Sequence, residues 1–581
     1  MRFPSLESLA RRAVTVLQRF PFTLLAGGIA ATAAIVESHR HGGPTDSSWL
    51  RLAFVAALAL PATVSVSLLS ETRRWSVGIR SGAFLGCFAG LAAFFLVWPG
   101  PEATHERIRY FQLSAALHLA VAFLPVPYAS ASMAFWQYNR RLFLGFLRAT
   151  FFSAVLFIGV AIAISALDHL FGVHVPPETY FRMWAVIAFV VNTWIFLAAI
   201  PEDLAALEHD REYPRALKVF AQYILTPLVF TYLLILLAYL VKLIAGAEWP
   251  SGWIGWLVAS VSVTGLLGFL LVHPLRAEAD DAWIRTYTRW LFIGLVPAAI
   301  MLLVAFWKRI VPYGLTEPRV MGLALGFWLL GIALVFSVRN GSSIRTIPLT
   351  LALLLVAMLY GPVSLTRLSI ASQGRRLAAT LAGREADEAS AALRFLIEHH
   401  AAEEIATRIG HSLPSFDWAT ASQYNQLDSI GTEILALVNV KYRPRSSYRD
   451  GSGRGDRSFT FSDGQALSTS AFEWAIPVTK GDSTLRMVGG DSVRLIPDST
   501  NTYARLRAGG DTLEFDLRAL ARAFEAVDTI GDRERPARLV SEKGAGSRRG
   551  TLALSQLSGR WRGDSVFIDY WRGWLLLGRA K

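Results

Sequence analysis

A dense group of reactive side chains lies between two apolar stretches near residue 310. Residues 308–319, KRIVPYGLTEPR, supply cations, a carboxylate, a hydroxyl and a phenol. Glu317 can pair there with Arg309 or Arg319, because an unpaired charge beside an apolar medium is costly. A guanidinium also binds a carboxylate or phosphate through a two-pronged fork. The first candidate site, for an anionic group, comprises Arg309, Tyr313, Thr316, Glu317 and Arg319; a tight turn that locks two helices is the alternative reading.

A second candidate set, a polar seam, follows one helical stretch. Lys218, Gln222 and Tyr223 occur at helical spacing at one end, and Lys242 lies at the other end. The seam could line a path through the protein. Aromatic and Lys side chains at helix ends more commonly anchor a helix to lipid headgroups.

No pattern in the chain predicts catalysis, a cofactor or a metal ion. A phosphate loop, a Gly-x-Ser-x-Gly elbow and a His-Glu-x-x-His helix are all missing from the sequence. His399 and His400, with acidic neighbours Glu398, Glu403 and Glu404, resemble a ligand set. Adjacent residues on a helix point about 100° apart, however, so the two imidazoles do not converge on one ion.

Composition indicates that lipid surrounds much of the chain. Of 581 residues, 53% are hydrophobic and 17% are charged, whereas soluble proteins carry about 25% charged residues. The net charge of +13 lies largely in short loops between apolar runs, so it predicts membrane orientation rather than nucleic-acid binding. The single cysteine, Cys87, excludes an intramolecular disulfide framework and a cysteine-clustered zinc site.

About eleven stretches are long and apolar enough to cross a bilayer whose hydrocarbon core is about 30 Å thick. Alternate loops on one side carry about twice as many Lys and Arg as those on the other, which puts the N-terminus in the cytoplasm. An odd number of spans then puts everything after residue 362 outside. The expected spans lie near 22–36, 50–70, 77–98, 109–128, 144–166, 181–200, 221–244, 252–272, 288–306, 319–337 and 345–362.

The last third of the chain has a different pattern of apolar and polar residues. Apolar residues recur at helical spacing before residue 436, and Gly-Asp-Ser/Thr units then punctuate short alternating stretches typical of strands. The expected layout is a cytoplasmic segment 1–20, a transmembrane domain 21–372, an amphipathic helical connector 373–436, a mobile linker 437–457 and a β-rich extracytoplasmic domain 458–581. The predicted fold class is thus a polytopic helical membrane bundle followed by a short helical segment and a small β-rich domain.

The stretch from Tyr213 to Arg319 resembles a known family. It contains YPRALKVFAQYILTPL, WPSGW and YGLTEPR, with Gly361-Pro362 and Ser372-Gln373 further on. Together these motifs are similar to the bacterial membrane family named domain of unknown function 4153, although Pro318 departs from its Thr-Glu-x-Arg element. The resemblance implies a polytopic protein of the bacterial cell envelope and supplies no reaction or catalytic residue.

These observations favour a non-enzymatic protein of the bacterial inner membrane. Its bundle would anchor an extracytoplasmic module for sensing or scaffolding, with the bilayer, envelope proteins or an anionic ligand as partners. One alternative is a transporter with a polar site near Arg309, Glu317 and Arg319. A second is a glycosyltransferase for lipid-linked sugars, whose acidic residues would be Glu37 and Asp46 in the first external loop.

Overall fold

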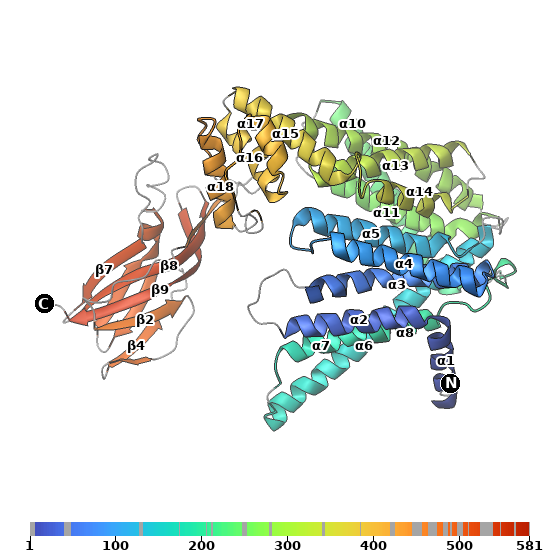
Figure 1. Ribbon diagram of the computed structural model, residues 1–581, viewed down its shortest axis with the longest axis horizontal. Helices are drawn as coiled ribbons and strands as arrows, with labels where there is room; N and C mark the ends of the chain where they lie inside the picture. Colours follow the sequence, from blue (N-terminus) through green and yellow to red (C-terminus); the bar gives the residue numbers. More distant parts are fainter. Residues whose placement is uncertain are drawn as a thin grey trace. The chain divides into compact units, whose positions relative to one another are not determined.

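A computed structural model divides the chain into two compact units, Met1–Tyr442 and Arg443–Lys581. Each unit is described by itself, and Figure 1 gives the labels of its elements. The structure describes residues 6–39, 48–126, 132–173, 175–204, 206–210, 213–246, 253–277, 282–339, 343–383, 385–416, 418, 424–443, 456–462, 473–479, 486–488, 491–496, 503–508, 511–522, 539–545, 548–562 and 565–579.

The first unit is helical throughout its described residues. The helices of its first half are α1 (Leu6–Arg19), α2 (Pro21–Ser38), α3 (Ser48–Thr72), α4 (Val77–Val97), α5 (Thr104–Phe123), α6 (Ser132–Phe171), α7 (Glu178–Val186), the π-helix η1 (Ile187–Val191), α8 (Asn192–Ala198) and the 3₁₀-helix η2 (Ala206–Glu208). Those that follow are α9 (Arg215–Val219), the π-helix η3 (Phe220–Leu225), α10 (Thr226–Ile244), α11 (Trp253–Val272), the 3₁₀-helix η4 (His273–Ala277), α12 (Ala282–Tyr313), α13 (Glu317–Val338), α14 (Thr346–Ala357), α15 (Leu365–Gly383), α16 (Ala386–Glu398), α17 (Ala402–Ile409) and α18 (Tyr424–Ala436).

Within the described residues, 9 helical segments are long and apolar enough to cross a membrane. They contain α2, α3, α4, α6, α7 with α8, α9 with α10, α11, α12 and α13. The protein is therefore a multi-pass membrane protein. Two of the eleven expected spans fall on helices outside this set: α5 begins with the charged run Thr104-His105-Glu106-Arg107, and α14 has 12 residues.

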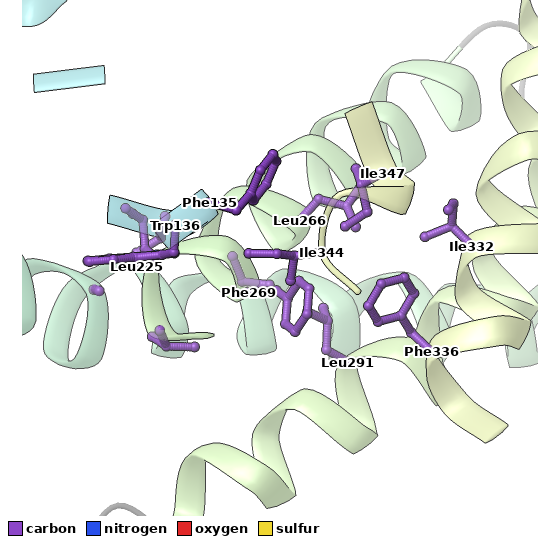
Figure 2. Packing of buried hydrophobic residues seen from close by; sticks show 14 of the residues in the cluster. Phe135, Trp136, Leu225, Leu266, Phe269, Leu291, Ile332, Phe336, Ile344 and Ile347 are labelled. Carbon is purple, nitrogen blue, oxygen red and sulfur yellow. The ribbon is translucent and has the colours of Figure 1, made fainter. Parts of the chain in front are cut away.

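One large hydrophobic cluster holds together the later spans and the start of α6. Phe269 of α11, Phe292 of α12 and Phe336 of α13 pack with ring centres 4.9–5.5 Å apart. Figure 2 shows Phe269 and Phe336 beside Leu291, Ile332 and Ile344 in this cluster. Aromatic rings at such distances add an edge or stacking attraction to their burial.

Helix α6 has 40 residues and changes character along its length. Near its start, Phe135, Trp136 and Tyr138 are buried in the large cluster. Beyond Arg148 many large apolar side chains are exposed, among them Phe151 and Ile162. An apolar surface that no protein atoms cover is what a lipid-facing helix presents.

Helices α15–α18 form a small helical cluster with a core of its own. Leu377, Leu393, Leu396, Ile405 and Ile434 are buried there. At the end of this unit the hydroxyl of Tyr442 donates to Asp428 Oδ1 at 2.7 Å, and Arg394 Nη2 lies 3.3 Å from the same oxygen. The boundary expected at residue 372 falls inside α15, which continues from Leu365 to Gly383.

The second unit contains two antiparallel sheets. Strands β1 (Asp456–Ser462), β8 (Arg548–Arg562), β9 (Ser565–Arg579) and β2 (Trp474–Thr479) form one sheet in that order, and β7 (Leu539–Ala545) also pairs with β8. Strands β3 (Arg486–Val488), β4 (Asp491–Ile496), β5 (Tyr503–Ala508) and β6 (Asp511–Asp516) form the other in sequence order. Leu513 and Phe515 are two residues apart on β6, so they lie on the same face of the strand. They share a core with Leu552 and Leu575 of the first sheet.

A tight turn joins α12 to α13 and is fastened to α15. Gly314 adopts a φ of 68°, the left-handed region that glycine enters without steric cost. Gln373 Nε2 of α15 donates to the carbonyl oxygens of Tyr313 and Leu315 at 3.0 and 2.9 Å. The Leu315 amide donates to Ser372 Oγ at 2.9 Å. Pro318 falls in the first turn of α13, where no intrahelical amide bond is lost.

Replacing Gly314 with alanine should destabilise this junction. The new Cβ would lie 2.9 Å from Gln373 Nε2 in a backbone conformation that costs an L residue about 1–2 kcal/mol. We expect a lower midpoint of thermal unfolding in detergent. Gly331→Ala in α13 is the matched control, because its Cβ meets no atom within 4 Å. Equal midpoints for the two variants would contradict the role given to the turn.

Candidate polar site at the ends of α12 and α13

The carboxylate of Glu317 is buried against a histidine from the helical cluster. Glu317 is the first residue of α13, and its Oε1 lies 2.7 Å from Nε2 of His399. The two side chains are 5% and 6% exposed. The positive end of the α13 dipole favours a carboxylate at this position. Glu317 therefore joins the bundle to the end of α16. The sequence pattern instead predicts a pairing of Glu317 with Arg309 or Arg319.

Two hydrogen-bond contacts fix the orientation of the His399 ring. His399 Nδ1 lies 2.7 Å from the carbonyl oxygen of Phe395, which can only accept, so Nδ1 carries a hydrogen. The other ring nitrogen, Nε2, then faces Glu317 Oε1.

Other titratable groups from α5 and α16 surround this pair. The ring of His105 stacks on that of His399 with centres 4.6 Å apart. Beside it, Glu106 Oε1 lies 3.4 Å from His105 Nε2 and also accepts from Arg109. Among the described residues, Glu106 Oε2 is buried and has no hydrogen-bond partner. Burial, and then the charges of His105 and His399, lower the pKa of His400 below its usual value.

The remaining members of the first candidate site lie around the α12–α13 turn. Arg319 Nη1 donates to the carbonyl oxygens of Tyr313 and Gly314 at 3.1 and 2.7 Å. Its guanidinium lies 5.7 Å from the centre of the Tyr313 ring, which is itself 53% exposed. Thr316 is the N-cap residue of α13, although its side chain makes no capping bond. Arg309 is exposed on the last turns of α12.

The four residues of the candidate polar seam are not brought together. Gln222, in η3, is buried, whereas the neighbouring Tyr223 is 74% exposed. Lys218 lies in α9, and Lys242 lies in the last turn of α10. The rise of the intervening helix separates the two lysines by roughly 35 Å. Any path along these residues would have to run the length of the membrane span.

The other polar groups considered from sequence give no assembled site. Glu37 lies in the last turn of α2, and Asp46 is outside the described residues. No group of three or more His, Cys, Asp or Glu within the described part of the chain is arranged to hold a metal ion. His399 and His400 differ in role: the first pairs with Glu317, and the second follows α16 with a left-handed φ of 52°.

Three residues of this region were not predicted from the sequence to belong to the site. His399 was considered only as a metal ligand, Gln373 only as part of a family motif, and Arg376 not at all. All three come from α15 or the end of α16, more than fifty residues after the turn that they contact. A usable signal was present in Gln373, because a polar residue on the apolar face of an amphipathic helix needs a partner.

Removing the carboxyl group of Glu317 should destabilise the first unit strongly. Glu317→Ala leaves His399 Nε2 buried without a partner, and breaking such a pair costs about 3 kcal/mol. Glu317→Gln should cost less, since an amide can still donate to Nε2. Denaturant titration in detergent micelles measures both, with the exposed Glu403→Ala as control. A loss in Glu317→Ala no larger than in the control would contradict the pairing.

Acidification should weaken the turn that follows α16. Because the folded protein lowers the pKa of His400, the unfolded chain binds a proton there more readily. Stability is therefore retained above about pH 6.5 and declines as the pH falls below that value. His400→Gln should show a smaller loss of thermal stability between about pH 7.5 and about pH 5.5 than the parent protein. An identical pH dependence in both proteins would contradict this.

Comparison with known proteins places the chain in a family. A match to the family described as "Domain of unknown function (DUF4153)" covers residues 23–387. It therefore includes Glu317, Arg319 and Gln373 and stops before His399.

The chain is also similar to "Uncharacterized protein PM1469" of Pasteurella multocida (strain Pm70). The two are 23% identical over 302 residues, and the matched region covers 52% of this chain and 50% of that relative. The chain thus spans about half the length of this curated relative. No solved structure matches. Because the family match covers more than half of the chain and confirms the resemblance seen in the motifs, the protein belongs to the DUF4153 family.

Proposed function

We propose that this protein is a bacterial inner-membrane anchor whose helical bundle carries an extracytoplasmic β-rich domain for sensing or scaffolding. The observation that carries the proposal is the polar junction between the bundle and helices α15 and α16. Gln373 and Ser372 hold α15 to the α12–α13 turn, and His399 holds the end of α16 to Glu317. A junction buried and bonded in this way transmits position and force between membrane and connector.

We infer that the bundle crosses the membrane about eleven times. The two helices beyond the nine apolar segments, α5 and α14, pack against each other, and α5 also packs against α3. Gln112 of α5 is buried and donates to the Leu355 carbonyl of α14 at 2.7 Å. A helix shielded by its neighbours need not be apolar on every face, which supports α5 as a span despite its charges.

The distribution of basic residues supports a cytoplasmic N-terminus. Arg19 ends α1 and Arg73 directly follows α3, and both positions would meet the cytoplasm in this orientation. Short cytoplasmic loops carry an excess of Lys and Arg. With an odd number of passes, α15–α18 and the two sheets would then lie outside the cytoplasmic membrane.

A specific observation also favours the transport alternative. The Glu317–His399 pair brings two ionisable side chains together at a buried position, and buried ionisable pairs near a membrane are a common element of proton-coupled transporters. Against this, two cavities formed by described residues lie elsewhere in the bundle. The one of about 280 Å³ is lined by apolar residues of α2, α3 and α4.

Fusion reporters test the proposed topology. Alkaline phosphatase fused after Lys581 should be active, and so should the same enzyme fused after Tyr442, because both points would lie outside the cytoplasm. A fusion after Asp210, in a loop assigned to the cytoplasm, is the control and should be inactive. Cytoplasmic fluorescence from a green fluorescent protein fused after Lys581 would overturn the orientation and the role of the β-rich domain.

A further inference from the structure

Three arginines that are far apart in sequence converge beside the α12–α13 turn. They are Arg309 of α12, Arg319 of α13 and Arg376 of α15, here called the arginine cluster. The guanidiniums of Arg319 and Arg376 lie 5.7 and 6.0 Å from the centre of the same ring, that of Tyr313. The charges of Arg309 and Arg376 both act on Arg319. Arg309 precedes Tyr313 by one helical turn, so it shares that face of α12.

Two of these guanidiniums are held in place by the fold. Arg319 is fixed by the carbonyl oxygens of Tyr313 and Gly314. Arg376 lies 3.2 Å from Glu388, and its Nε is buried without a hydrogen-bond partner among the described residues. Groups that are already oriented lose little conformational freedom when they bind a ligand. Arg309 and Tyr313 are exposed, which leaves the cluster open to solvent or lipid.

The cluster has fewer negative charges than positive ones. Glu317, the nearest acid in sequence, is turned to His399 and is buried with it. Glu388 contacts Arg376 and is 47% exposed. The positive charges of Arg309 and Arg376 both act against that of Arg319. Like charges at close range oppose folding unless an anion neutralises them.

We propose that Arg309, Arg319 and Arg376 bind a phosphate group. Guanidiniums match phosphate oxygens through paired hydrogen bonds, and three of them suit a phosphate better than a singly charged carboxylate. The cluster lies where one span ends at Tyr313 and the next begins at Glu317, which is the depth of the headgroup region. The phosphate therefore belongs either to an anionic lipid or to a soluble phosphate compound, and the same residues would bind both.

Binding by the full-length protein in lipid nanodiscs distinguishes these sources. One arm titrates phosphatidylglycerol into phosphatidylcholine discs and counts retained lipid by native mass spectrometry. The other arm titrates pyrophosphate against protein in pure phosphatidylcholine. We expect saturable binding in one arm, weakened roughly tenfold or more in R309Q/R376Q. This variant leaves the turn bonds of Arg319 intact. The matched control R73Q/R148Q, which removes two exposed arginines elsewhere, should bind like the parent protein.

Two further variants keep the test decisive. Glu388→Gln removes the carboxylate that competes for Arg376, so it should tighten binding. If R309Q/R376Q fails to fold, R309K/R376K retains both charges without the fork and should bind several-fold more weakly than the parent protein. The proposal is overturned if neither arm shows saturable binding. It is equally overturned if the cluster variants bind as the control does, or if Glu388→Gln weakens binding.

Discussion

A charge that leaves water must meet an opposite charge or several hydrogen-bond partners, and this constraint organises the first unit. At the N-terminal end of the bundle, Arg19 forms a bond of 2.8 Å with Glu71 and also donates to the carbonyl oxygens of Ile200 and Pro201. At the other end of the spans, Glu317 is satisfied by His399. Each of these bonds joins helices that are remote in sequence, so the cost of burying charge is offset by contacts that define the fold.

Most of the membrane part could be predicted from local pattern, because a bilayer demands long apolar helices. The stretches near 50–70, 252–272 and 319–337 correspond to α3, α11 and α13. Helices α5 and α14 show where this reasoning stops. Helix α5 carries charges and α14 is short, so composition and length alone do not identify them as spans. Their packing against each other supports that assignment. Strands at 486–488 and 491–496 were also foreseeable from turn residues and alternation.

The candidate site was only partly predictable. The residues around Tyr313 and Glu317 stood out because charge was compressed between apolar stretches. The partner of Glu317 could not be recognised in the sequence, because His399 lies 82 positions later and reaches Glu317 only through the packing of α15 and α16. Arg376 is similar: nothing local distinguishes it from the other arginines of α15. Helical geometry does separate Gln222 from Tyr223, because adjacent residues face different directions.

The uncharged part of α6 is as long as the hydrocarbon core of a bilayer is thick. Between Arg148 and Asp168 its residues are uncharged, and at 1.5 Å per residue they extend about 30 Å, which equals the thickness of the hydrocarbon core. The two charges thus stand one such thickness apart along the helix. The first part of α6, about 24 Å long, precedes this uncharged stretch. Within this first part, Arg140 and Arg141 pair with Asp210, and because the side chains of Arg140 and Asp210 are only 6% and 15% exposed, the pairing offsets the cost of removing these charges from water.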